Sequence, residues 1–247
     1  MKKKYLLVLL TLGIFAHGAK AQQSNDTNQR ASSIVASYYS ILNYDAIPKD
    51  SILYIETHIV QRGSTDTLLM LRWFAVPQYN RIEIWDQNVL LTGYHSDGKS
   101  SFREYDTTLH MWKDINSDTY LDKVAPYDFH GPLYHWQNHG VELQYDGEYK
   151  FEGHPVYRIS AKSPQTYDRK YLFEKETGLL FLFTESDSID GNALARKGNR
   201  RKDWHAYHEF QPLNTIVLPS QESYQYNSTI TLISHKAKFI GFNQKLF

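Results

Sequence analysis

The sequence has no cysteine among its 247 residues. Disulfide bonds, thiolate metal ligands and cysteine nucleophiles are therefore excluded, and the fold must be held together by its core alone. Because no lipobox cysteine is present, we also expect the chain to carry no lipid anchor at its own N-terminus.

Long hydrophobic runs are also scarce. The one apolar run at the start, Tyr5–Ala16, is shorter than the stretch of about 20 residues that a membrane-spanning helix needs. It follows the basic residues 2–4 and precedes Ala19-Lys20-Ala21, the small-x-small pattern that signal peptidase recognises. The sequence therefore predicts a signal peptide over residues 1–21, a mature chain that begins at Gln22, and export to the periplasm.

An excess of positive charge is lacking as well. The chain has 27 basic and 27 acidic residues, and Lys2, Lys3, Lys4 and Lys20 would leave with the signal peptide. The mature chain then has 23 basic residues against 27 acidic ones, a net charge of −4. This balance argues against a general nucleic-acid binder. We expect residues 22–247 to form a single domain and to be monomeric.

Aromatic residues, in contrast, are plentiful: 19 tyrosines, 12 phenylalanines and 5 tryptophans. Such a content is typical of strands and of pockets that take apolar ligands. Over residues 27–43, however, the apolar side chains recur at helical spacing, which predicts one amphipathic helix. Pro48 ends any continuation of that helix.

Beyond residue 50 the apolar residues take the period of strands, and turn residues separate the segments. The expected strands are 51–60, 66–75, 80–85, 89–95, segments through Phe102–Tyr105 and Met111–Trp112, and then 141–149, 156–161, 167–173, 179–186, 204–210, 220–226 and 229–239. Short helices are expected at 117–124 and 131–139. A sheet of about 11 or 12 strands must curl or close, so we expect a mainly β (α+β) fold, strongly curved around its helices.

Five segments stand out by their order and spacing. The most specific is Asp128–Ile159, with a helix opened by Gly-Pro-Leu, a Tyr-Asp-Gly-Glu turn and a strand of the form G-x-x-x-Y-x-I. The others are YLFEKETGLL at 171–180, YHEFQPLNTIVLP at 207–219, VPQYNRIEI at 76–84 and SDGK at 96–99. Together they resemble the outer-membrane lipoprotein-sorting proteins of the LolA/LolB-like class, over most of residues 28–240.

The resemblance implies an incomplete, strongly curved antiparallel β-barrel whose helices cover a hydrophobic cavity. It further implies a non-catalytic carrier or binder of lipids or acylated lipoproteins, with no metal or cofactor. The chain departs from the family where Phe102 stands in place of a tryptophan, and Arg72 is the one candidate for the arginine that latches the family's lid. The alternative is a periplasmic sensor or adaptor on the same fold, whose main ligand is a protein, such as a membrane-associated partner.

Seven apolar residues are candidates for lining the implied cavity. Three alternate along one expected strand, two share a face of the next, and two lie at helical spacing in the expected short helix. Residue by residue they fit an ordinary core equally well, and the family resemblance is what favours a cavity. They are Leu69, Leu71, Trp73, Ile82, Ile84, Leu133 and Trp136.

Motifs for catalysis and metal binding are incomplete. His130, His135 and His139 lie close together in the sequence, but Trp136 follows His135 where a zinc-binding H-E-x-x-H motif needs glutamate. No G-x-S-x-G motif is present either. We therefore expect no enzyme, with a secreted hydrolase as the third interpretation. The basic cluster at 196–202 is interpreted as a solvated loop or, alternatively, as a contact with anionic head groups or an acidic partner.

Overall fold

The computed structural model describes residues 26–76, 79–97, 99–124, 127–131, 133–162, 169–184, 204–226 and 229–247. The predicted signal peptide, its cleavage site and the basic cluster at 196–202 lie outside these residues. In the described residues, 13 strands form one antiparallel sheet in the order β6-β5-β4-β3-β2-β1-β13-β12-β11-β10-β9-β8-β7. The strands are β1 (Ser51–Gln61), β2 (Thr67–Ala75), β3 (Tyr79–Asp86), β4 (Val89–Ser96), β5 (Phe102–Asp106), β6 (Met111–Asp114), β7 (Glu142–Phe151), β8 (His154–Lys162), β9 (Arg169–Glu174), β10 (Leu180–Thr184), β11 (Trp204–Leu213), β12 (Ile216–Tyr226) and β13 (Thr229–Gly241).

The chain builds this sheet from its middle. Strands β1 to β6 run outward as consecutive hairpins on one side, and β7 to β13 run inward from the other edge. The first and last strands therefore meet in the centre, where 11 residue pairs from Ser51↔Gly241 to Gln61↔Thr231 join β1 to β13. Alternation and turn chemistry predict the hairpins one by one, whereas the pairing of β1 with β13 is long-range.

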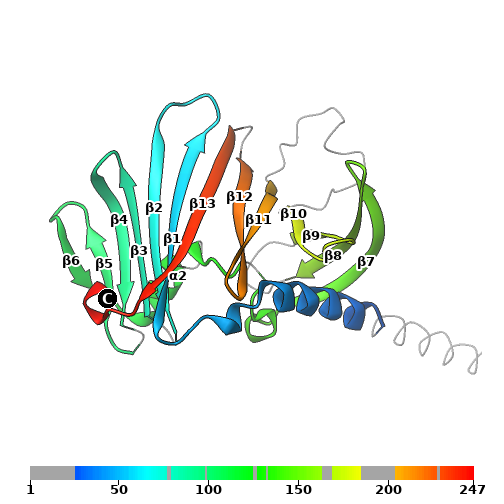
Figure 1. Ribbon diagram of the computed structural model, residues 1–247, viewed down its shortest axis with the longest axis horizontal. Helices are drawn as coiled ribbons and strands as arrows, with labels where there is room; N and C mark the ends of the chain where they lie inside the picture. The colour runs from blue at the N-terminus through cyan, green and yellow to red at the C-terminus, as the bar shows by residue number, and fades with distance from the viewer. Residues whose placement is uncertain are drawn as a thin grey trace, which may run out of the picture.

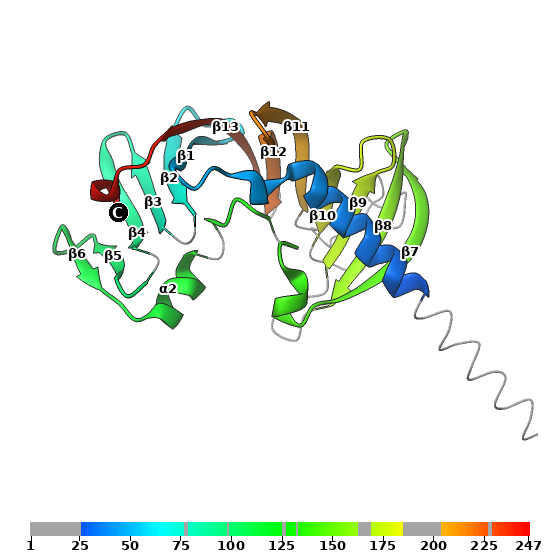
Figure 2. The same ribbon diagram turned by 60° about the horizontal axis from the view of Figure 1, so that its bottom comes forward.

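The sheet is strongly curved but open, with β6 and β7 as its edges (Figure 1). A helix over residues 26–42 lies across its concave side, from β12 towards β7 (Figures 1 and 2). The helix α2 (Ser117–Val124) lies against the other half, next to β5. The expected incomplete, curved antiparallel fold is thus confirmed, and each of the 13 strands in the described residues lies at an expected segment, although the expected size of the sheet was about 11 or 12 strands. No helix among them is long and apolar enough to cross a membrane.

The helix of residues 26–42 is held by its apolar stripe. Ala31, Val35, Tyr38 and Leu42 are each at most 3% exposed and pack against the concave face of β1 and β7–β12. Because an isolated helix of this length is marginal in water, its stability comes chiefly from this packing. It runs into the 3-10 helix η1 (Tyr44–Ala46). Another 3-10 helix, η4 (Gln244–Leu246), lies near the C-terminal end.

A separate apolar cluster lies under α2. Met70, Ile82 and Tyr94 from β2, β3 and β4 meet Tyr120 from α2, and all four are at most 8% exposed. The concave side therefore has two apolar regions, one beneath the long helix and one beneath α2.

A hydrogen-bonded ion pair between Arg81 and Glu83 lies on the outer face of β2 and β3. Glu83 is only 5% exposed and accepts hydrogen bonds from Arg81 Nε at 2.9 Å and from Trp85 Nε1 at 3.1 Å. The Arg81 guanidinium lies over the ring of Trp73, 5.3 Å from its centroid. This outer face is therefore mixed in character, with an ion pair shielded by indole rings.

The expected helix over residues 131–139 is wrong in extent. In its place the structure has turns at 133–135 and the 3-10 helix η3 (Trp136–His139). His135 has φ 50°, outside the helical region, and Gly140, with φ 63°, ends the 3-10 helix. His135 and His139 therefore do not share a turn of α-helix, which removes the spacing that favoured a zinc pair.

Leu42→Ala should lower the free energy of unfolding by about 2–5 kcal/mol, because it leaves a cavity where the helix meets the sheet. Ile41, its neighbour, is 36% exposed, so Ile41→Ala is expected to cost less than about 1 kcal/mol. Urea unfolding of both variants measures the difference. Equal costs would contradict the packing of residues 26–42 described above.

Candidate functional site

Polar side chains cross the middle of the concave face on five neighbouring strands. They are Arg72 on β2, Thr57 on β1, His235 on β13, Glu222 on β12 and His205 on β11. Thr57 is fully buried, Arg72 is 8% exposed, and the side chains of His235 and Glu222 are 8% and 11% exposed. We call these five residues the polar line. It lies between the two apolar regions of the concave side.

The hydrogen bonds of the polar line form one continuous chain. Arg72 Nη2 donates to Thr57 Oγ1 at 3.2 Å, and Thr57 Oγ1 lies 2.9 Å from Nδ1 of His235. Because arginine carries only donors, Thr57 accepts from Arg72, and its hydroxyl oxygen also takes part in the hydrogen bond with His235. Nε2 of His235 then donates to Oε1 of Glu222 at 2.9 Å, and His205 Nε2 donates to Oε2. The line therefore ends on the carboxylate of Glu222.

Glu222 is held in its ionised form. Burial alone would raise the pKa of its carboxyl group, but the hydrogen bonds from His205 and His235 lower that pKa far below the ordinary value of 4.5. Burial lowers the pKa of the Arg72 guanidinium, and the negative charges of Glu222 and Asp128 partly offset this. The polar line thus joins a buried cation to a buried anion through the hydroxyl of Thr57 and the imidazole of His235.

A segment around residues 127–139 covers the polar line. Arg72 Nη1 donates to the carbonyl oxygen of Tyr127 at 3.2 Å, so the candidate for a latch does bond to this segment. The Phe129 ring packs against Phe74 of β2 and Tyr44 of η1, with centroids 5.1 Å and 5.5 Å apart. We call residues 127–131 and 133–139 together the cover. Aromatic contacts and the Arg72 hydrogen bond hold it on the sheet.

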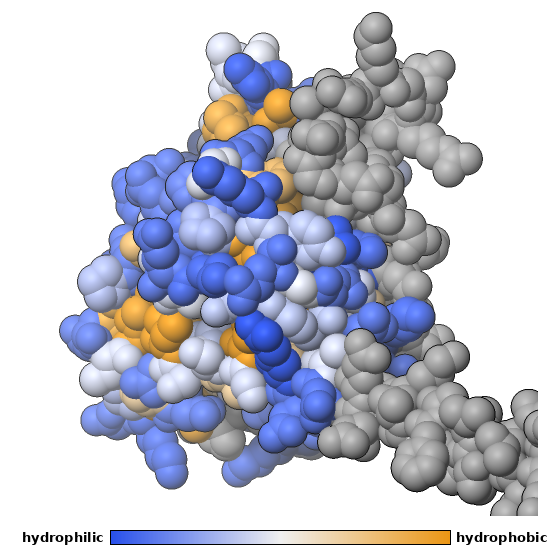
Figure 3. Space-filling view, turned by 90° about the vertical axis from the view of Figure 1, so that its right-hand side faces the viewer, coloured by the Kyte–Doolittle hydropathy of each residue, from blue (hydrophilic) through white to orange (hydrophobic). Residues whose placement is uncertain are grey.

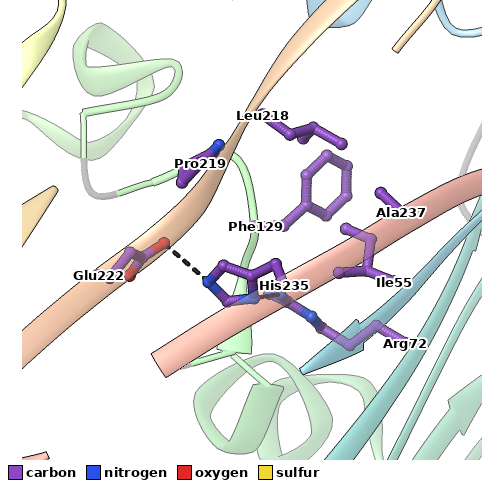
Figure 4. Close-up of a pocket in the computed structure, with 8 residues that line it drawn as sticks. All are labelled: Ile55, Arg72, Phe129, Leu218, Pro219, Glu222, His235 and Ala237. Atoms are coloured by element: carbon purple, nitrogen blue, oxygen red, sulfur yellow. Dashed lines mark hydrogen bonds and ion pairs between the residues drawn. The ribbon is translucent and has the colours of Figure 1, made fainter. Parts of the chain in front are cut away.

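A hollow lies beneath Phe129 (Figure 4). Its volume is about 20 Å³, room for one water molecule. Phe129 is the lining residue that comes from the cover, whereas the others come from β1, β2, β12 and β13. These others are Ile55, Arg72, Leu218, Pro219, Glu222, His235 and Ala237. At this point of the concave face, protein side chains, Phe129 among them, occupy the space around the hollow.

Three of the seven predicted cavity residues lie on the wrong face. Arg72 reaches the cover through Tyr127, so Leu69, Leu71 and Trp73, which alternate with it on β2, point to the outer face. The prediction that they line the cavity is therefore corrected. A strand's alternation defines two faces without saying which one is covered, and the charged Arg72 belongs to the covered face.

The other four lie on the covered side. Ile82 pairs with Arg72 across β3 and β2, and Ile84 lies two residues further on the same face, within the region under α2. Leu133, 2% exposed, and Trp136 pack into the region under the long helix. The structure thus brings them into two adjacent groups, and a role of these residues in ligand binding stays a prediction.

Sequence reasoning missed four members of the polar line. Thr57, His205, Glu222 and His235 lie far apart in the chain, and no motif links them. One signal was present: Thr57 follows Leu53 and Ile55 at intervals of two, so a polar residue occupies the phase of buried positions. Such a break in phase marks a buried polar group that needs a partner.

The polar line has the order of a nucleophile, a base and an acid, but its chemistry differs from that of a catalytic triad. Thr57 is fully buried, and its oxygen already accepts from Arg72. We therefore assign it no nucleophilic role. Among the described residues, no group of three His, Asp or Glu side chains is arranged to hold a metal ion.

Glu222→Gln should lower the free energy of unfolding by about 3 kcal/mol at pH 7, because Arg72 loses its buried counter-charge. The depressed pKa means that the carboxylate's contribution is fully present above pH 4.5, the ordinary value, and is lost as the pH falls through the lower folded-state value. The difference between wild type and variant should therefore shrink at pH 3. Urea unfolding at the two pH values measures it.

Glu209→Gln is the matched control, since Glu209 is exposed on the adjacent strand β11. It should change the free energy of unfolding by less than about 0.5 kcal/mol. A Glu222→Gln deficit that is the same at pH 3 and pH 7 would contradict the buried, ionised carboxylate.

No family model and no curated protein matches the sequence. Solved structures do match. A DUF1329 family protein from Desulfovibrio piger is 13% identical with a TM-score of 0.56, covering 90% of this chain and 97% of its own. A LolA superfamily protein from Nitrosomonas europaea and a domain described as an outer membrane lipoprotein-sorting protein, from Vibrio parahaemolyticus, are each 10% identical with a TM-score of 0.54, covering 88% of this chain and 96% of theirs. At such identities the likeness establishes the fold, and the chain has the LolA-like fold that its sequence predicts.

Proposed function

We propose that this protein is a non-catalytic binder or carrier of lipids or acylated lipoproteins, which it shelters on the concave face of its sheet. The observation that carries the proposal is an apolar concave face closed by a separate cover. A LolA superfamily protein and a lipoprotein-sorting domain among the solved structures of this fold support it. The predicted signal peptide supports the periplasm as the place of action.

Binding requires the cover to move, because the hollow beneath Phe129 is far smaller than an acyl chain. Burying about ten CH₂ groups contributes about 8 kcal/mol, whereas withdrawing Phe129 and Leu133 from the core costs about 3–6 kcal/mol. An acyl chain can therefore replace the side chains of the cover with a net gain. The ligand would take over the apolar contacts that the cover makes in the closed form.

The distribution of apolar side chains on the outer surface agrees with entry of the ligand beneath the cover. On the β7 side, polar side chains separate the apolar patches of the described surface (Figure 3). The contacts that must break lie instead between Phe129 and Phe74 and between Tyr39 and Tyr134, whose ring centroids are 5.4 Å apart. Movement of residues 127–139 would expose the sheet while the strands stay paired.

The proposal is tested by mass spectrometry of organic extracts from the mature protein, purified from its native compartment without detergent. We expect a stoichiometric lipid or acylated peptide in the extract. A stable protein that is free of such a ligand would overturn the carrier proposal and leave the adaptor, with a protein as its main ligand, as the interpretation to pursue.

Ile84→Asp should reduce the amount of co-purified lipid at least about fivefold, because it places a charge on the covered face. Leu69→Asp is the matched control: Leu69 is also half-buried, but it lies on the outer face of the neighbouring strand. It should leave the lipid content unchanged. Equal effects of the two substitutions, measured on folded protein, would show that the concave face is not the binding surface.

A further inference from the structure

We propose that Arg72 is a recognition site for the neutral carbonyl group, ester or amide, at the head of a bound acyl chain. The inference rests on the proposed function and goes further, since it names the polar group of the ligand and the atom that receives it. Its basis is the buried Nε of Arg72, which has no hydrogen-bond partner among the described residues, together with the hollow that the Arg72 side chain lines.

The guanidinium of Arg72 uses only part of its hydrogen-bonding capacity. Nη1 donates to Tyr127 and Nη2 to Thr57, but Nε, which is buried, has no partner in the described part of the chain. A buried N–H without an acceptor is unfavourable, and native proteins rarely leave one without a reason. The polar line therefore has a free donor at its cationic end.

That end of the line faces the hollow in which a ligand head group would lie. Arg72 lines it together with Ile55, Leu218 and Ala237, which form an apolar floor on β1, β12 and β13 (Figure 4). Phe129 is the contribution of the cover. A ligand that displaces Phe129 would lay its chain over the floor and bring its head group to Arg72.

The charges around the hollow favour a neutral head group. Glu222 lines the same hollow, and its depressed pKa keeps it ionised, while Asp128 is close enough for its charge to act on Arg72. The charge of Arg72 is thus already opposed by two carboxylates. A fatty-acid carboxylate would add a third negative charge in a buried site, whereas a carbonyl oxygen accepts the Nε proton without adding charge.

Four probes, three with the same decanoyl chain and one hydrocarbon of similar length, test the inference by displacement of a fluorescent apolar dye at pH 7.5. They are methyl decanoate, N-methyldecanamide, sodium decanoate and undecane. We expect the ester or the amide to bind about tenfold more tightly than undecane, the gain expected of one hydrogen bond from a charged donor. Decanoate should bind more weakly than either. The ester and amide arms distinguish glycerolipid-like ligands from N-acylated ones.

Arg72→Lys keeps the positive charge and removes the Nε donor, so it should bring the affinities of ester and undecane within about twofold of each other. Because the substitution also removes the hydrogen bond to Tyr127 that holds the cover, the readout is the ratio of ester to undecane affinity within each protein, and circular dichroism reports that the variant is folded. A measurement without substitution is the infrared carbonyl band of bound, carbon-13-labelled methyl decanoate, which should lie at a lower frequency than the band of the same ester in a hydrocarbon solvent, because the carbonyl oxygen accepts a hydrogen bond.

The outcomes separate the two proposals. If undecane and both carbonyl compounds bind with equal affinity, or if decanoate binds most tightly, the carbonyl site is overturned while the apolar binding face stands. A carbonyl band of the bound ester at the frequency found in hydrocarbon solvent likewise overturns it. If none of the four probes binds, the proposed function fails and the carbonyl site fails with it.

Discussion

A carboxylate buried in the middle of a β-sheet needs a counter-charge, and the centre of this molecule is arranged to provide one. Glu222 and Arg72 lie three strands apart, and Thr57 and His235 carry the hydrogen bonds between them. Leaving either charge alone would cost several kcal/mol, so the pairing of β2, β1, β13 and β12 is tied to the pairing of the charges. Because Arg72 also donates to Tyr127, the position of the cover depends on the same group.

Much of the fold was predictable because its units are local. Hairpins with turn residues between alternating strands fix each strand within a few residues, and the short helix at 117–124 has the bounds that its sequence predicts. The structure of residues 131–139 was not predictable in this way. His135 has a left-handed backbone conformation that divides the segment, and no residue type in the sequence indicates this conformation. The pairing of β1 with β13 joins residues at opposite ends of the chain, which alternation within one strand does not encode.

The site was harder to predict than the fold. Leu71 and Ile84 look alike in sequence, yet they face opposite sides of the sheet, because the covered face is chosen by long-range packing. The predicted site residues were all apolar, although the polar line crosses the middle of the concave face. Arg72 lies in the phase of Met70 and Phe74. This charged residue in an otherwise apolar row is, like Thr57, a sequence signal for a buried polar group.

The proposed function requires that the concave face bind its ligand only when the cover lifts. Because the chain has no cysteine, Phe129→Cys with Leu218→Cys provides two unique thiols on the cover and on the sheet, beside one hollow. A cleavable bis-maleimide joins them and fixes the cover in place. We expect methyl decanoate binding to be lost when the thiols are joined and to return when the linker is cleaved. Equal binding by the joined and the cleaved protein would contradict this requirement.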